Sequence, residues 1–472
     1  MSAPSRNVAV VGGGWAGCAA AVELARRGAA VTLFEQARTL GGRARGVEVH
    51  GRTLDNGQHI LLGAYKHTLA LFRRVGVDPA RVLLRLPLQM RYPAGSGGMD
   101  FVAPRLPAPW HMMVALVRAT GLARADKMAM ARFSTAARWM GWQLDDDVSV
   151  SVLLDRFEQT PRLQRLMWHP LCLAALNTAP ERASANVFLA VLRDSLGAKR
   201  AASDMLIPRL ELGALLPQAA GRYLEARGGS VRSGAKAETL ARTAAGWELA
   251  ASGQALGGAW RGVFDAVVLA TPPAQAATLL APFAEAAGLA AQLHAFEHEP
   301  IATCYLQYGP DLRLPLPFCA LLDAPGRRHF GQFVFDRGQL DPGQAGLLAV
   351  VVSAAGEAAA LDQETLARGI AAQLDAAFPG LGLAAPQWQR VITEKRATFA
   401  CTPGLARPAN ATVLAGLVLA GDYTAGDYPA TLESAVRSGE AAAAIILRGD
   451  ASSAKNGSLS HAGGKPGADS VT

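Results

Sequence analysis

A glycine-rich turn between two short apolar runs constrains the fold of this 472-residue chain more than any other feature. The β-branched run 7–11 leads into a Gly-x-Gly-x-x-Gly motif formed by Gly12, Gly14 and Gly17, and a helical pattern then leads to a second apolar run at 30–34. Strand, glycines, helix and strand in this order within about 30 residues are the pattern of a βαβ dinucleotide-binding unit. The sequence therefore predicts an α/β fold with a Rossmann-type domain.

Each residue of this motif has a physical reason to be there. Gly12 permits the tight turn, Gly14 lets the backbone approach a pyrophosphate, and Gly17 lets the helix pack closely on the strand. Glu35 ends the second strand at about the 20-residue spacing of an acid that accepts hydrogen bonds from ribose hydroxyls, and its charge would repel the 2′-phosphate of NADP. Three neighbours are expected to join the cofactor site: Trp15, Ala16 and Gln36.

Two later segments favour FAD over a nicotinamide dinucleotide. A Gly-Gly-Arg triplet at 41–43 offers close backbone passage and an arginine that can reach a phosphate. Near the C-terminus, an apolar strand at 412–420 leads to a Gly-Asp pair and then to a helix. The carboxylate suits a ribityl hydroxyl, and the helix N-terminus can stabilise the anionic reduced flavin. The cofactor candidates in these segments are Gly42, Arg43, Gly421, Asp422, Thr431 and Leu432.

Together these features resemble the amine-oxidase/phytoene-desaturase superfamily of flavoproteins, as does a strand at 264–270 that leads into Thr271, Pro272 and Pro273. Within that superfamily the chain is most similar to the squalene-associated group, the hydroxysqualene dehydroxylases, and the resemblance extends to about residue 449. The segments that carry it are 54–59, 170–177, 181–185, 402–408 and 429–439. Tyr423 departs from the group, which often has Trp at this place.

The resemblance implies non-covalent FAD, with Gly57 and Gln58 at the flavin and the backbone of Ala237 at the adenine. It also implies reductive removal of an allylic hydroxyl from hydroxysqualene, giving squalene for hopanoid synthesis, with hydride from the reduced flavin. His59, at the substrate face, or a residue of the loop before the last helix would assist the departure of water. The alternative for His59 is a structural histidine, and the loop residues could merely cap the helix. The loop candidates are Asp427 and Tyr428.

The same pattern predicts that the FAD-binding domain is discontinuous in sequence. Segments that carry dinucleotide-binding signals alternate along the chain with segments that carry none. The two substrate segments are expected to form an inserted α+β domain, and the Ser-, Gly- and Ala-rich end is expected to be a disordered tail. The FAD-binding segments are 1–75, 215–275 and 390–449, the substrate segments are 76–214 and 276–389, and the tail is 450–472.

The stretch 101–141 stands out within the first substrate segment. It holds six Arg or Lys residues against one acid, Asp126, and five of the ten methionines, with Trp110 and Trp139 near its ends. A basic amphipathic helix with flanking Trp is typical of peripheral contact with an anionic membrane surface. A packed helix with an ordinary solvated face is the alternative. Methionines suit a tunnel for a long, flexible chain.

Composition excludes several other classes. Apolar residues make up 50% of the chain and charged residues 18%, which is typical of a globular protein. The net charge is +8, but the basic residues are not clustered with stacking aromatics, so nucleic acid is not expected as a partner. Five scattered cysteines lack disulfide or metal spacing, which predicts a reduced cytoplasmic protein without a metal site. Cys401 lacks the sequence context of a covalent flavin attachment site.

Two readings compete with the dehydroxylase. One is a carotenoid-type desaturase or an amine oxidase that uses oxygen or a quinone, although the terminal motif lacks the His-Pro-Gly-Gly-Gly pattern of typical desaturases. The other is a non-catalytic flavin-bearing protein at a membrane surface. The sequence leaves open the electron donor and whether an upstream synthase hands over the substrate.

Overall fold

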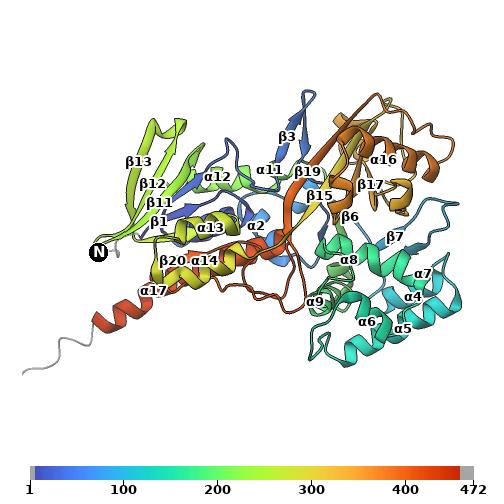
Figure 1. Ribbon diagram of the computed structural model, residues 1–472, viewed down its shortest axis with the longest axis horizontal. Helices are drawn as coiled ribbons and strands as arrows, with labels where there is room; N and C mark the ends of the chain where they lie inside the picture. Colours follow the sequence, from blue (N-terminus) through green and yellow to red (C-terminus); the bar gives the residue numbers. More distant parts are fainter. Residues whose placement is uncertain (1–5, 458–472) are drawn as a thin grey trace, which may run out of the picture.

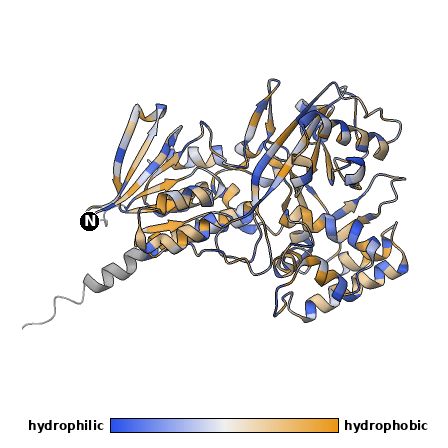
Figure 2. Ribbon diagram, in the orientation of Figure 1, coloured by the Kyte–Doolittle hydropathy of each residue, from blue (hydrophilic) through white to orange (hydrophobic). Residues whose placement is uncertain are grey.

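The computed structural model describes residues 6–457, and its central element is a five-stranded parallel sheet (Figure 1). The strand order is β10-β2-β1-β14-β20, so segments from both halves of the chain lie side by side. The strands are hydrophobic along most of their length (Figure 2). Their bounds are β1 (Asn7–Val11), β2 (Ala30–Glu35), β10 (Ser230–Ser233), β14 (Ala266–Leu269) and β20 (Leu417–Leu419).

The alternation of side chains along β1 divides the core into two layers. Val8 and Val10 pack with the helices of one face, whereas Ala9 and Val11 pack with the elements of the other. This is the two-residue period of a strand that is buried on both faces. The first layer contains α1 (Trp15–Arg26), α2 (Lys66–Arg74), α11 (Leu212–Leu215), α12 (Pro217–Glu225) and α17 (Leu432–Gly457). The second contains α13 (Pro273–Leu280), α14 (Ala287–His294) and an antiparallel sheet of β11 (Lys236–Thr243), β12 (Gly246–Gly253) and β13 (Gly258–Phe264).

A five-stranded antiparallel sheet forms the second part of the molecule, in the order β16-β17-β18-β15-β19. Its two longest strands pair from His298 opposite Phe399 to Gln307 opposite Trp388, and they run from this sheet toward the parallel sheet (Figure 1). The strands are β15 (His298–Gln307), β16 (Phe318–Ala320), β17 (Phe333–Asp336), β18 (Leu347–Val352) and β19 (Trp388–Phe399). Two helices pack on the sheet: α15 (Gly356–Ala359) and α16 (Gln363–Ala377).

Helices at the end of the molecule opposite the β11–β13 sheet complete the second part (Figure 1). They surround Phe133, Trp168 and Phe188, whose rings make edge-to-face contacts. The helices are α4 (Trp110–Arg118), α5 (Arg124–Trp139), α6 (Val150–Arg156), α7 (Pro161–Leu163), α8 (His169–Leu176) and α9 (Ala185–Ser195). A π-helical turn at Gln164–Trp168 joins α7 to α8.

Short elements connect these parts. Three small antiparallel sheets pair β3 with β4, β7 with β8, and β5-β9-β6. Their bounds are β3 (Gly46–Val49), β4 (Arg52–Asp55), β5 (Leu61–Leu62), β6 (Leu83–Leu86), β7 (Gln89–Arg91), β8 (Asp100–Val102) and β9 (Met205–Pro208), and two short helices are α3 (Pro79–Val82) and α10 (Arg200–Ser203). Between residues 6 and 457, no helix combines the length and the apolar character that crossing a bilayer requires.

The arrangement differs from the expected segments in two places. The boundary expected between residues 275 and 276 falls inside α13, and Ala276, Leu280 and Leu293 of α13 and α14 belong to one core with Val267 and Leu269 of the parallel sheet. Helix α17 continues to Gly457 and so extends into the segment expected to be a disordered tail. The rest of that segment, 458–472, lies outside the described residues.

Helices α1 and α17 pack closely against each other in the helical layer of the parallel sheet, and a substitution at their contact tests this packing. A Cβ on Gly439 would lie 2.2 Å from the carbonyl oxygen of Ala16, whereas a Cβ on Gly288, in α14, would meet nothing within 4 Å. We expect Gly439→Ala to destabilise the protein by about 1–3 kcal/mol, because the backbone cannot yield without moving a helix. Gly288→Ala, the matched control, should stabilise it by about 0.5–1 kcal/mol through helix propensity. Urea unfolding of both variants checks this; equal effects would contradict the packing.

Candidate active site

A cavity of about 660 Å³ lies at the carboxyl ends of the parallel strands. Its walls include Val11 at the end of β1, Glu35 at the end of β2, Ala270 after β14 and Gly421 after β20. This edge is where open α/β sheets bind their ligands. The cavity therefore lies between the first and the last segments of the chain.

The structure brings together fifteen of the sixteen residues that the sequence predicts for the cofactor. The residues that line the cavity are Gly12, Gly14, Trp15, Ala16, Glu35, Gln36, Gly42, Arg43, Gly57, Gln58, Ala237, Gly421, Asp422, Thr431 and Leu432. The sixteenth, Gly17, lies behind the wall, where a Cβ would be 1.9 Å from the carbonyl oxygen of Gly12. That close helix–strand contact is the role expected for this glycine.

The glycine turn has the shape of a phosphate cradle. Gly12 has φ +106°, and a Cβ there would lie 2.5 Å from the carbonyl oxygen of Ala270. At Gly14 the space is open, since the nearest heavy atom to an added Cβ is the Cα of Gly42 at 4.0 Å. Gly14 is also the N-cap of α1 and has no side chain that could bond to the first N–H groups of the helix. These N–H groups are thus free to bind an anion.

The carboxylate of Glu35 is fixed at the same edge. One oxygen accepts a 2.7 Å hydrogen bond from the N–H of Gly13, and the other accepts a 2.7 Å bond from the N–H of Ala37. Each carboxylate oxygen keeps a further lone pair. The group can therefore accept ribose hydroxyls while the backbone holds it in place.

Arg43 and Asp422 form an ion pair across the cavity wall. One guanidinium nitrogen donates to both carboxylate oxygens at 2.7 Å, and a second donates to the carbonyl of Ala397 at 2.6 Å. We expected Arg43 at a phosphate. In the structure it instead fixes the carboxylate that the sequence assigned to the ribityl chain, and so it joins segments 379 residues apart.

Arg407 is a site residue that sequence reasoning missed. Its guanidinium donates to the carbonyls of Asp422, Gly426 and Tyr428 at 2.7–2.9 Å and lies 4.9 Å from the ring centre of Phe399. Burial lowers the pKa of Arg407, but an arginine keeps its charge in proteins. The residue therefore holds the loop 422–428 beside the cavity. Its position in the segment 402–408, which carries the family resemblance, was the available signal.

His59 lines the cavity, but its hydrogen bond and its protonation do not suit a proton donor. Its Nδ1 lies 2.5 Å from the carbonyl oxygen of Gly57. A carbonyl only accepts, so Nδ1 carries the hydrogen and Nε2 keeps a lone pair. Burial lowers the pKa of His59, and the charge of Arg43 lowers it further. A neutral imidazole with a free Nε2 accepts protons.

The other two catalytic candidates, Asp427 and Tyr428, lie in different environments. The side chain of Asp427 is 72% exposed, lines neither cavity described here and faces Arg193 at 3.5 Å. The catalytic role expected for Asp427 is therefore wrong, because its solvated side chain does not reach either cavity. Tyr428 is buried and donates its hydroxyl to Asp194 at 2.8 Å.

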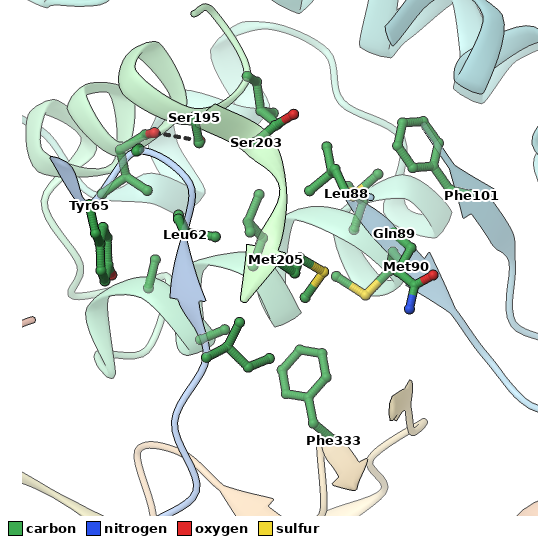
Figure 3. A pocket seen from close by; sticks show the side chains of 18 of the residues that line it. Leu62, Tyr65, Leu88, Gln89, Met90, Phe101, Ser195, Ser203, Met205 and Phe333 are labelled. Carbon is green, nitrogen blue, oxygen red and sulfur yellow. Dashed lines mark hydrogen bonds between the residues drawn. The ribbon is translucent and has the colours of Figure 1, made fainter. Parts of the chain in front are cut away.

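A second cavity, of about 120 Å³, adjoins the first and is almost wholly apolar (Figure 3). Six residues line both cavities, so the two are neighbours. Of the five methionines in the stretch 101–141, Met112 and Met130 line the apolar cavity, whereas Met113 and Met128 are exposed. The methionines that line this cavity are Met90, Met112, Met130, Met167 and Met205.

Comparison with known proteins agrees with this geometry. The model of the flavin containing amine oxidoreductase family matches residues 15–447. The chain belongs to this family. It is therefore a flavin-dependent oxidoreductase, and the open cradle at Gly14 fits the phosphates of such a cofactor.

Two relatives and one solved structure extend the comparison. The hydroxysqualene dehydroxylase of Rhodopseudomonas palustris is 31% identical over 94% of this chain and 99% of its own length. That of Sinorhizobium fredii is 29% identical over 94% and 98%. The cyclohexylamine oxidase of Brevibacterium oxydans has the same fold, with a TM-score of 0.65, 18% identity and coverage of 95% of this chain and all of that one.

A substitution at Gly14 in the glycine turn should affect flavin binding without affecting folding. Gly14→Ala should leave the stability of the apoprotein unchanged, because an added Cβ meets no atom closer than 4.0 Å and φ is −71°. The methyl group would instead occupy the space of the pyrophosphate, and we expect flavin affinity to fall about tenfold or more, as overpacking of 1–3 kcal/mol implies. Flavin titration and thermal unfolding of the apoprotein measure the two effects. Full flavin affinity in this variant would place the phosphates elsewhere.

Proposed function

We propose that this protein is an FAD-dependent dehydroxylase that reduces hydroxysqualene to squalene. The observation that carries the proposal is the apolar, methionine-rich cavity that adjoins the cofactor cavity, since a hydrocarbon chain fits such a wall and a polar metabolite does not. Two hydroxysqualene dehydroxylases that match the chain almost end to end support this substrate.

The cofactor in this proposal is FAD, held without a covalent bond. A dinucleotide with a flavin accounts for a cavity that extends from Glu35 and Ala237 to Asp422 and Thr431, the residue before α17. The five cysteines are buried, and none lines this cavity among the described residues, which supports non-covalent attachment. The helix N-terminus at Leu432 suits the negative charge of the reduced ring.

The reaction is reductive. The reduced flavin supplies a hydride, and the chain supplies orientation, exclusion of water and a proton for the departing hydroxyl. The apolar cavity holds the isoprenoid chain against the cofactor cavity, so that the carbon that bears the hydroxyl faces the flavin. We place the protein in the reducing cytoplasm, in hopanoid synthesis, after the synthase that provides hydroxysqualene. Its five unpaired cysteines are typical of that compartment.

The main alternative is oxidation of an amine or a carotenoid with oxygen or a quinone as acceptor. An ammonium substrate is favoured by acidic side chains, and among the described residues no Asp or Glu lines the apolar cavity. A carotenoid would fit the same apolar wall, so the direction of electron flow is what distinguishes it.

Anaerobic incubation of the reduced protein with hydroxysqualene tests the proposal. We expect the flavin to reoxidise as squalene forms, one squalene per flavin, because a single hydride is transferred per turnover. The control is the same incubation with squalene in place of the alcohol, which should leave the flavin reduced. Reoxidation by oxygen or quinone alone, with polyenes or amines as reductants, would favour the alternative. No turnover with either class would favour a non-catalytic protein.

We further propose that helices α4 and α5 rest on an anionic membrane surface, where a water-insoluble substrate is dissolved. Exposed arginines alternate in the sequence with exposed apolar side chains, while Asp126, the one acid in 101–141, is buried. The same helices carry Met112 and Met130 of the apolar cavity, so a lipid contact would lie close to the substrate. The exposed apolar residues are Leu106, Trp110, Met113, Val117, Met128 and Trp139, and the exposed basic residues are Arg105, Arg118, Arg124, Arg132 and Arg138.

Vesicle sedimentation tests this contact. The protein should bind vesicles that contain phosphatidylglycerol, bind pure phosphatidylcholine vesicles more weakly, and dissociate as salt is raised. Trp110→Ser combined with Val117→Ser should weaken binding about tenfold or more, since apolar burial is lost. Val413→Ser, which changes an equally exposed valine on a loop elsewhere, is the matched control and should bind normally. Equal binding to both vesicle types, or none, would contradict the proposal.

A further inference from the structure

The wall between the two cavities is almost free of polar side chains. Six residues line both cavities, and four of them are apolar. Of the residues that the structure describes, only Tyr65 and Thr431 bring hydroxyl groups to this boundary. The six are Ile60, Tyr65, Ala174, Ala175, Phe333 and Thr431.

The proposed reaction needs a proton at this boundary. When the C–O bond of the alcohol breaks, the electron pair stays on the oxygen, and a proton must join it for water to leave. The hydride from the reduced flavin, which becomes oxidised, forms the new C–H bond. In the overall reaction, an alcohol, a hydride and a proton give a hydrocarbon and water. The protein must therefore provide the proton where the substrate meets the flavin.

The other polar side chains near the boundary do not provide this proton. His59 has its free ring nitrogen as an acceptor, as shown above. Ser195 and Ser203 line only the apolar cavity and donate to the backbone carbonyls of Val191 and Arg200. Tyr428 lines only the apolar cavity and donates to Asp194, and the amide of Gln89 lies at the opposite end of that cavity from Tyr65 (Figure 3).

We propose that Tyr65 is a catalytic residue that donates its phenolic proton to the departing hydroxyl of the substrate. This inference rests on the proposed dehydroxylation and names the acid that the reaction requires. Thr431 is a positioning residue in it: it lines the same boundary between the cavities, and its hydroxyl donates to Ser434 at 3.2 Å. Two elements distant in sequence thus bring the phenol and a second hydroxyl to one place.

The local structure fixes the phenol at this place. Tyr65 follows the short strand β5 and is the N-cap of α2. Its N–H donates to the carbonyl of Leu62 at 3.0 Å, and its carbonyl accepts from the N–H of Leu69 at 3.0 Å, so the backbone is bonded on both sides. The side chain is 8% exposed. Burial raises the pKa of Tyr65, so the phenol keeps its proton at neutral pH, and the nearby Thr431 opposes this rise only in part.

The test compares Tyr65→Phe with the wild-type holoenzyme and with Tyr308→Phe. Tyr308 is buried, lines neither cavity and donates to the carbonyl of Leu383 at 2.7 Å, so its variant loses a phenol of the same kind outside the site. We expect Tyr65→Phe to lower the single-turnover rate about 10²–10⁴-fold, the usual contribution of a general acid. Flavin content, KM for hydroxysqualene and binding of squalene should stay at wild-type values, and the wild-type solvent deuterium isotope effect should change. Tyr308→Phe should turn over normally.

The outcomes separate this inference from the proposed function. If the wild type makes no squalene, the proposed function fails and the inference fails with it. If the wild type makes squalene and Tyr65→Phe does so equally fast, only the inference is overturned. If the single-turnover rate fell in Tyr428→Phe but not in Tyr65→Phe, the inference would also be overturned, since the acid would then be Tyr428. A rise in KM with unchanged kcat in Tyr65→Phe would reduce Tyr65 to a binding residue and contradict the proton transfer.

Discussion

The ion pair between Arg43 and Asp422 is the contact on which the site depends, because it fastens the first and the last segments of the chain at one edge of the parallel sheet. The glycine turn and Glu35 belong to the N-terminal segment, and the loop after Gly421 and the start of α17 belong to the C-terminal one. Neither segment alone encloses a cofactor. Arg407 extends the same connection, since its three carbonyl contacts hold the loop that Asp422 begins.

The site combines two environments of opposite character. The cofactor cavity contains fixed charges and free helix N–H groups, whereas the adjoining cavity is lined by methionine, leucine and phenylalanine. A substrate that is hydrocarbon except for one oxygen suits this contrast, because only the reacting carbon needs to approach polar groups. The polar groups that could meet that oxygen are the two hydroxyls at the boundary and the neutral imidazole of His59 in the cofactor cavity.

The sequence predicted those site features that are encoded within one short stretch of the chain. The turn at Gly12, Gly14 and Gly17 and the acid at Glu35 follow from spacing within one βαβ unit, and in the structure they lie together at one edge of the parallel sheet. Spacing could not show that Arg43 pairs with Asp422, nor that α13 and α14 pack on the parallel sheet, since these contacts join residues far apart along the chain.

The same limit applies to the catalytic candidates. Asp427 was chosen for its residue type and its place before α17, but its exposure depends on how the loop turns. Tyr65 had no motif to mark it, because its position between two cavities arises only when α2 and α17 come together.

Release of the cofactor tests the central claim most directly. If both ends of the chain enclose one non-covalent dinucleotide, acid precipitation of the purified protein should release one FAD per chain, and the precipitate should be colourless. Asp422→Ala should then release little or none from a folded protein, because the C-terminal half of the site has lost its carboxylate. FMN in place of FAD, a flavin that stays with the precipitate, or full FAD content in Asp422→Ala would contradict the account.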